Sequence, residues 1–174
     1  KPKPVEVEAP VTQYAIVGFT TTCLEAVPLL DDPEWHVWGM NNLHAQQPFT
    51  PHTSKFSAWF DLHPTADIRK DAQHDAWLKS GSDGVPVYVF DPPADWPTAQ
   101  AFPKDQMIAQ FGRYFTNSVS WMLALALAKL ARDDGSLPPG SKIAIYGIDM
   151  ATGTEYSAQR PSVEFFLGIA AGLG

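Results

Sequence analysis

One segment, residues 114–150, constrains the fold more than any other part of this chain. Residues 116–118, Thr-Asn-Ser, open a long and almost wholly apolar run. The next apolar run, residues 142–146, is followed by Gly-Ile-Asp149. A buried helix that leads into a buried strand is part of a βαβ unit, and such folds bind ligands at helix N-termini and at the carboxyl ends of strands. The segment therefore predicts a fold class and also the place of a ligand.

The rest of the chain repeats this alternation of strands and helices. Short apolar runs predict strands at residues 13–18, 34–40, 55–62, 85–90 and 142–146. Longer segments predict helices at residues 65–79, 103–112, 117–131 and 161–171, the last with Pro161 as its first residue. This order predicts a single Rossmann-like α/β domain, with a mostly parallel sheet of about five strands and helices on both faces.

Two connecting segments have their own signals. Thr22 and Glu25 have the spacing of a helix capping box, and Pro28 predicts that this helix is short or kinked. Residues 91–102 are rich in proline and are expected to form a long loop. Long loops inside compact domains are often lids or binding loops.

Composition and charge exclude several classes of protein. A length of 174 residues fits one domain, expected at 12–174 after a disordered tail or linker at 1–11. The net charge of −7 argues against general nucleic-acid binding, which requires a basic surface. No apolar run is long enough to span a bilayer and no secretory signal is visible, so we expect a cytoplasmic protein that does not bind membranes. A partner subunit that completes the sheet, and thus a homo-oligomer, is a further expectation.

The loops after the first two predicted strands offer candidate nucleotide-binding residues. The first loop, residues 18–22, contains three threonines but neither the G-x-G-x-x-G motif nor the Walker motif, so dinucleotide and P-loop assignments lose their usual support. Thr22 can bind a phosphate at a helix N-terminus, or it can simply cap that helix. Asn41 and Asn42 can bind a base or a ribose hydroxyl, although adjacent asparagines also form ordinary turns.

Asp61 and His63 follow the third predicted strand and carry a catalytic signature. Their spacing places both side chains on one face if the strand continues, where they could act as a base and its orienting carboxylate. A purely structural His63 fits the same pattern. The other histidines show no close ligand spacing, so the sequence predicts neither a metal site nor another cofactor.

The strongest ligand signal is the group Thr116, Asn117 and Ser118. The helix that follows is apolar nearly all round and must therefore be buried, which directs these short polar side chains toward the crevice of the sheet. Helix capping needs only one of the three. The remaining two predict contact with a ligand.

A polar cluster lies at the last predicted helix. Arg160 and Glu164 are four residues apart and can pair on the surface. Glu164 also aligns with Gly168 and Ala171 at helical spacing, a face of small residues that permits close approach. A carboxylate on that face could bind ribose hydroxyls or act as a nucleophile.

Five short pieces, scattered over most of residues 14–156, are similar to motifs of known families. They are residues 16–22 (IVGFTTT), 37–42 (VWGMNN), 59–64 (WFDLHP), 115–126 (FTNSVSWMLALA) and 143–150 (IAIYGIDM). Their order resembles the bacterial sialyltransferases that use CMP-sialic acid and the Rossmann-like proteins related to archaeal pterin diphosphokinases. The chain is also similar to small uncharacterised phage-encoded proteins with Asn-Asn, Tyr-Phe-Thr-Asn and Gln-Arg-Pro-Ser-x-Glu motifs.

The resemblance implies a cytidine-nucleotide site built from several strand ends. It implies that Thr22 and Tyr156 approach phosphate, that Asn41, Asn42 and Asp61 reach ribose or base, and that Thr116, Asn117 and Ser118 line the pocket. Asp149 and Arg160 are further candidate nucleotide-binding residues. The chain departs from the family at Asp61, where the family carries Asn, and in its lack of any histidine after His74. Nucleotide binding is therefore better supported than sialyl transfer.

The sequence thus predicts a domain that binds a nucleotide or nucleotide-sugar. A glycosyltransferase-type activity on a pyrimidine nucleotide donor would use His63 as base. One alternative is a nucleotide N-glycosidase that uses Glu164, and another is a non-catalytic protein that sequesters a nucleotide. The similarity to phage proteins adds the expectation that the protein acts in a host cytoplasm.

Overall fold

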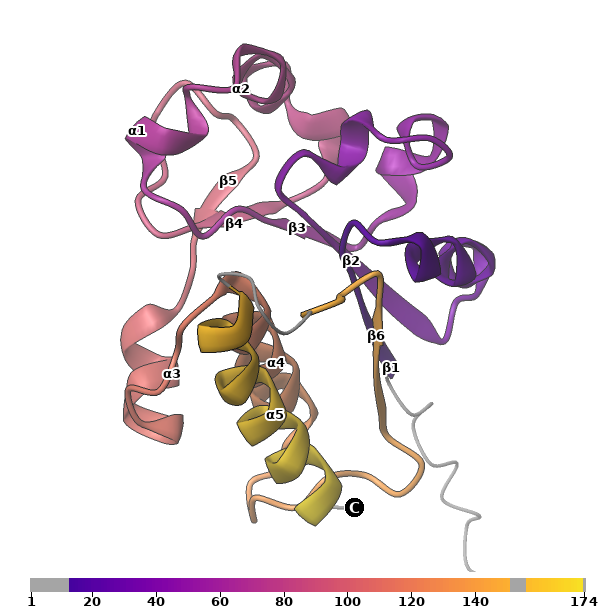
Figure 1. The fold of residues 1–174 in the computed structure, drawn as a ribbon, viewed down its shortest axis with the longest axis vertical. Coiled ribbons are helices and arrows are strands. Elements are labelled where there is room, and N and C mark those ends of the chain that lie inside the picture. The colour runs from indigo at the N-terminus through magenta and orange to yellow at the C-terminus, as the bar shows by residue number, and fades with distance from the viewer. Residues whose placement is uncertain (1–12, 151–155, 174) are drawn as a thin grey trace, which may run out of the picture.

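The strands of the computed structural model, which describes residues 13–150 and 156–173, form one parallel sheet in the order β5-β4-β3-β2-β1-β6 (Figure 1). Parallel neighbours require crossover connections, which the intervening helices supply. The strands are β1 (Gln13–Val17), β2 (Trp35–Met40), β3 (Ala58–Phe60), β4 (Val87–Val89), β5 (Ala99–Ala101) and β6 (Lys142–Tyr146).

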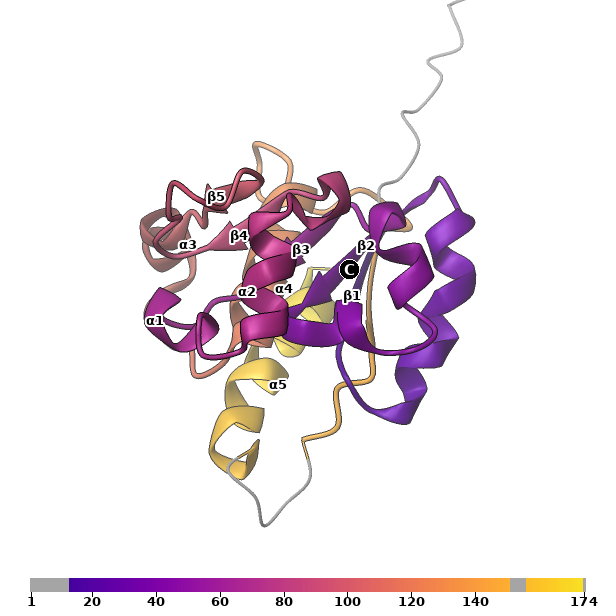
Figure 2. The same ribbon diagram turned by 90° about the horizontal axis from the view of Figure 1, so that it is seen from above.

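Helices cover both faces of this sheet (Figures 1 and 2). One face packs against α3 (Lys104–Phe111), α4 (Ser118–Leu130) and α5 (Tyr156–Gly172). The other face carries α1 (Thr65–Ile68), α2 (Ala72–Lys79) and the 3-10 helices η1 (Thr21–Asp31), η2 (Asn41–Ala45), η3 (Thr50–Lys55) and η4 (Ser82–Gly84). These layers confirm the predicted α/β class.

Side chains that alternate between the two faces of the sheet form two separate apolar cores. In β1, Tyr14 and Ile16 pack toward α4, whereas Ala15 and Val17 pack toward η1. Because successive side chains of a strand point to opposite faces, every residue of β1 is buried, as a central parallel strand requires. The helix α4 is buried on most of its surface and fills the first of these cores.

The connections define a topological switch point between β1 and β6. The chain steps outward from β1 through β2, β3 and β4 to β5, then returns to the opposite side of β1 as β6. Connections therefore leave β1 and enter β6 on different faces of the sheet. Ligands of open α/β folds bind at such a point, outside the carboxyl ends of the strands.

Several predicted boundaries were wrong, and each has a local cause. Residues 91–102 are not wholly loop, because the short strand β5 forms there as an edge strand. The helix predicted at residues 65–79 is divided into α1 and α2, because Asp71 caps α2 by accepting from two backbone N–H groups. The last helix begins at Tyr156, so Pro161 lies inside it. Residues 1–11, the predicted tail, lie outside the described residues.

The capping box predicted at Thr22 was also wrong. The residue that precedes η1 is Thr20, and no side chain caps that helix. The Thr22 hydroxyl instead accepts a hydrogen bond from the Gly147 N–H at 3.0 Å. Its oxygen is used to hold the end of β6.

Two glycines make the backbone contact at the switch point. A Cβ on Gly18 would lie 2.5 Å from the Gly147 carbonyl oxygen, and a Cβ on Gly147 would lie 2.9 Å from the Gly18 backbone. Gly147 also has a φ of 65°, which L side chains rarely adopt. Only glycine at both positions lets the ends of β1 and β6 approach this closely.

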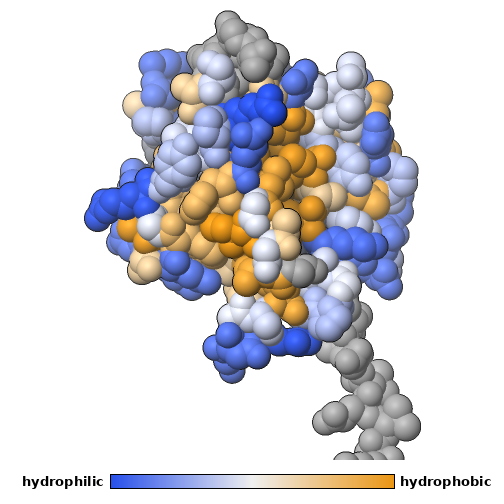
Figure 3. Space-filling model, turned by 60° about the horizontal axis from the view of Figure 1, so that its bottom comes forward, coloured by the Kyte–Doolittle hydropathy of each residue, from blue (hydrophilic) through white to orange (hydrophobic). Residues whose placement is uncertain are grey.

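A second cavity, of about 510 Å3, lies at the opposite end of the sheet. It is bordered by β6 and by the ends of α4 and α5, with Leu130, Ile143 and Ala170 among its walls. Figure 3 brings this end of the molecule forward and shows apolar side chains gathered between hydrophilic ones.

None of the helices within residues 13–150 and 156–173 has the length and apolar character that a membrane span needs.

We predict that Gly147→Ala lowers the free energy of unfolding by about 2 to 4 kcal/mol, because a left-handed backbone and a steric clash act together. Gly140→Ala is the matched control, since Gly140 has a φ of 82° and open space around its Cβ position. The control should lose only about 1 kcal/mol. Urea denaturation measures both, and equal losses would contradict a steric role for Gly147.

Candidate functional site

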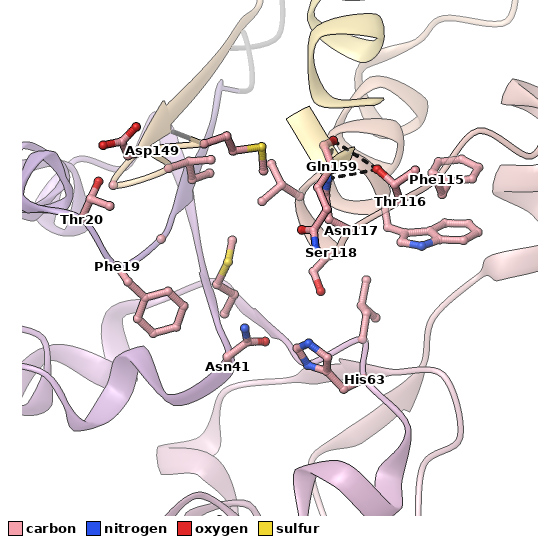
Figure 4. Close-up of a pocket in the computed structure, with 18 residues that line it drawn as sticks. Phe19, Thr20, Asn41, His63, Phe115, Thr116, Asn117, Ser118, Asp149 and Gln159 are labelled. Carbon is pink, nitrogen blue, oxygen red and sulfur yellow. Dashed lines mark hydrogen bonds between the residues drawn. The ribbon is translucent and has the colours of Figure 1, made fainter. Parts of the chain in front are cut away.

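A cavity of about 550 Å3 opens at the switch point (Figure 4). Its walls are the loops that follow β1, β2, β3 and β6, together with the first turn of α4. This volume lies in the range of ordinary small-molecule sites. The cavity therefore occupies the place that the sheet topology predicts for a ligand.

Several residues predicted from sequence meet around this cavity although they lie far apart in the chain. The lining includes Asn41, His63, Thr116, Asn117, Ser118 and Asp149. Asp61 lies directly behind His63. Phe19, Phe115 and Trp121 also line the cavity and were not predicted as site residues from the sequence.

Other predicted residues lie elsewhere. Asn42 donates to the Asp71 carboxylate at 3.3 Å on the surface, although its neighbour Asn41 faces the cavity. Arg160 and Glu164 form a half-exposed ion pair of 2.7 Å, and neither lines the cavity. Tyr156 begins α5, but its side chain lies outside the described residues.

Asp61 and His63 form a close acid–base pair. Oδ1 of Asp61 lies 2.6 Å from Nδ1 of His63. The Asp61 N–H donates to the Tyr88 carbonyl, which extends the strand pairing past β3 and fixes the carboxylate. The Asp61 side chain is 5% exposed and that of His63 is 53% exposed. The two side chains meet as their spacing predicted, with His63 between the carboxylate and the cavity.

This contact changes the protonation of both groups. The hydrogen bond to Asp61 raises the pKa of His63 above its ordinary value, against the opposing effect of burial. Burial alone would raise the pKa of Asp61, but hydrogen bonds from His63 and His74 lower it. The pair therefore favours an ionised carboxylate beside an imidazolium. Among the described residues that line the cavity, His63 alone can carry a positive charge.

Asn41 is held in an uncommon backbone conformation. Its φ is 48°, in the left-handed region that asparagine tolerates better than most residues. The indole N–H of the fully buried Trp59 donates to the Asn41 carbonyl at 2.8 Å and holds this conformation. The side-chain Oδ1 of Asn41 is buried and has no hydrogen-bond partner among the described residues. Strained residues with unsatisfied polar atoms cluster at ligand sites.

The group Thr116, Asn117 and Ser118 is mainly a structural joint. Asn117 caps α4, since its Oδ1 accepts from the Ser120 N–H, and its Nδ2 donates to the Gln159 carbonyl of α5 at 2.9 Å. The Thr116 hydroxyl donates to the same carbonyl. Ser118 differs, because its hydroxyl points into the cavity on the side of His63 (Figure 4).

Aromatic rings form one wall of the cavity. The rings of Phe115 and Trp121 stack with centroids 3.6 Å apart and planes 6° from parallel. Phe19 lines the cavity from the loop after β1. Phe115 also stacks on Phe166, with ring centroids 5.0 Å apart, so both faces of its ring are covered. The Phe19 ring therefore suits a planar ring in a ligand better than this pair does.

The described part of the chain holds no group of three or more His, Cys, Asp or Glu side chains arranged to bind a metal ion. Comparison of the chain with protein-family models, with curated proteins and with solved structures finds no match. The fold is therefore Rossmann-like only in the general sense of a parallel α/β sheet. Its function has to be argued from the cavity.

We predict that Asn41→Gly leaves the free energy of unfolding within about 0.5 kcal/mol of wild type, because glycine adopts a positive φ without strain. Asn41→Ala should be about 1 kcal/mol less stable than the glycine variant. Thermal and urea unfolding compare the two. If alanine is tolerated as well as glycine, the left-handed backbone at this position is not a source of strain.

Proposed function

We propose that this domain binds a nucleotide or nucleotide-sugar in the cavity at the switch point. One observation supports this proposal above all. A single cavity combines a helix N-terminus, a histidine with a raised pKa, the aromatic ring of Phe19 and the side-chain amide of Asn41. A nucleotide carries a complementary group for each of these features.

The phosphate would lie at the first turn of α4. The first backbone N–H groups of a helix have no partner within it, and Ser118 and Val119 at this end line the cavity. The Ser118 hydroxyl and the His63 imidazolium add a donor and a positive charge on the same side. Together they can bind one phosphate group.

The base would lie against the ring of Phe19. Phe19 offers an aromatic ring, and the Asn41 side-chain NH2 supplies a donor to the edge of a base. Thr20 and Asp149 line the cavity at the switch point and provide oxygens for ribose hydroxyls. The resemblance to CMP-sialic-acid enzymes makes a cytidine nucleotide the first one to test.

The Asp61–His63 pair equips the same site for transfer chemistry. With Nδ1 of His63 bound to Asp61, Nε2 is the ring nitrogen left to meet a ligand. Such an atom can accept a proton from an acceptor hydroxyl or donate one to a leaving phosphate. We propose a glycosyltransferase-type reaction, in which His63 handles that proton and Asp61 holds the ring.

The two alternatives differ in the residues they need. An N-glycosidase that uses Glu164 would require this carboxylate at the ligand, but Glu164 pairs with Arg160 on the surface. A protein that only sequesters a nucleotide needs the cavity but no turnover. Recovery of the bound nucleotide intact after long incubation with candidate acceptors would favour sequestration over transfer.

We predict that a nucleotide from a panel of nucleoside mono-, di- and triphosphates and nucleotide-sugars raises the midpoint of thermal unfolding. Ligand at about 100 times its Kd should add roughly 2.7 kcal/mol. Ser118→Ala and Asn41→Asp should each weaken binding about 5- to 20-fold by calorimetry, since each removes a group that would donate to the ligand.

Glu164→Gln is the matched control for these variants. Its exposed ion pair lies outside the cavity, so the Kd should stay within about twofold of wild type. If no nucleotide in the panel stabilises the protein, the proposed function is wrong. If Glu164→Gln abolishes base release from a nucleotide while binding is retained, the glycosidase alternative holds.

We predict that phosphate binding depends on pH through His63. Because the pKa of His63 is raised in the free folded protein, the affinity should be fully present at pH values well below that raised pKa and should fall as pH rises through it. The loss should be about tenfold, the contribution expected from one charge-assisted hydrogen bond. Calorimetry with a nucleotide phosphodiester measures it, because such a probe has no titration near neutral pH. His63→Gln should bind more weakly and show a flat profile.

A further inference from the structure

Four side chains form a continuous chain of hydrogen bonds from the cavity into the core. His63 Nδ1 meets Asp61 Oδ1 at 2.6 Å, and Asp61 Oδ2 meets His74 Nε2 at 3.0 Å. His74 Nδ1 then meets His44 Nε2 at 2.9 Å. The function proposed above uses only the first pair.

The direction of the bonds follows from the chemistry of the carboxylate. An ionised carboxylate can only accept, so His63 and His74 must both donate to Asp61. Burial, with a smaller effect from His74, lowers the pKa of His44 to about 4, which keeps that ring neutral. A neutral ring can donate through its Nε2–H to Nδ1 of His74. Each nitrogen along the chain thus has a consistent role.

The buried end of this series of hydrogen-bonded side chains is fixed by packing. His44 and His74 are both buried, and His44 stacks on Trp77 with ring centroids 4.1 Å apart. The backbone N–H of His74 donates to the Asp71 carboxylate, which caps α2 and sets the start of that helix. Buried polar groups are costly unless every member is satisfied. Asp61 can orient His63 without any further partner, so the second donor to Asp61, His74, requires a separate explanation.

We infer that His74 is a positioning residue that sets how strongly the Asp61 carboxylate binds the proton of His63. By holding Oδ2, His74 shares the charge of Asp61 between two donors and leaves less of it for the ring in the cavity. The basicity of His63 is thereby adjusted to its proposed role in proton transfer at the ligand. This consequence rests on the proposed function, whereas the coupling itself is a property of the free protein.

Other charged side chains act on these histidines and must be left unchanged in any test of the coupling. Asp67 on α1 acts on His63 from a distance, and Asp71 and Asp83 act on His44. None of these side chains needs to be altered, because the coupling is probed at His74 itself. Gln reaches about as far as histidine and can still donate to Asp61, whereas Phe keeps a ring but has no donor.

The experiment is an NMR titration of the histidine rings in the free protein, for wild type, His74→Phe and His74→Gln. The midpoint of the His63 titration should rise by about one pH unit in His74→Phe, because Asp61 then serves His63 alone. His74→Gln should restore it to within about 0.3 pH units of wild type.

An unchanged His63 midpoint in His74→Phe would overturn the inference. If His74→Phe does not fold, the wild-type spectrum tests the inference instead. The nitrogen chemical shifts of His74 must then show a proton on Nε2, and a spectrum that shows Nε2 without a proton overturns the inference as well. The titration uses no ligand, so failure of nucleotide binding leaves its result intact. Conversely, wild-type binding with an unaltered His63 midpoint in both variants would reject the coupling and retain the proposed function.

Discussion

The backbone contact between Gly18 and Gly147 is the constraint on which the ligand site depends. The two glycines end strands that are adjacent in space but distant in sequence, and the Gly147 N–H and C=O are bound by Thr22 and Thr20. Because backbone groups close the sheet at this point, no side chain has to fill the space between the strand ends. The cavity opens there, with the loops after β1 and β6 as one wall and the start of α4 as the other.

A buried aromatic cluster supports the opposite side of the site. Gly39 leaves room for the ring of Trp59, which would clash with a Cβ at that position. From there Trp59 donates to the Asn41 carbonyl and packs edge-on against His44 and Trp77. The strained asparagine and the buried histidine chain therefore rest on the same ring. A change in the packing of Trp59 would move both the amide and the acid–base pair of the cavity.

Local sequence patterns predicted most of the elements and the edge of the sheet where the cavity lies, but not the long-range partners of its residues. The spacing of Asp61 and His63 sufficed because the extended chain continues past β3 and keeps both on one side. The period of the apolar residues likewise predicted α4 and β6. Asn117 was predicted to contact a ligand, but nothing local shows that its amide also binds a carbonyl 42 residues away. His74 was missed for the same reason, since only the fold brings it to Asp61.

The protonation state of His63 decides what kind of chemistry the cavity favours. A raised pKa, caused first by the hydrogen bond to Asp61, keeps the ring cationic further toward neutral pH. A cationic ring attracts phosphate and can give a proton to a leaving group, but it cannot take one from an acceptor. The shift therefore extends the pH range of the electrostatic and general-acid roles upward, at the expense of the general-base role first predicted for His63. A transferase built on this site would stabilise the departing nucleotide and rely on another group, or on a higher pH, to activate the acceptor.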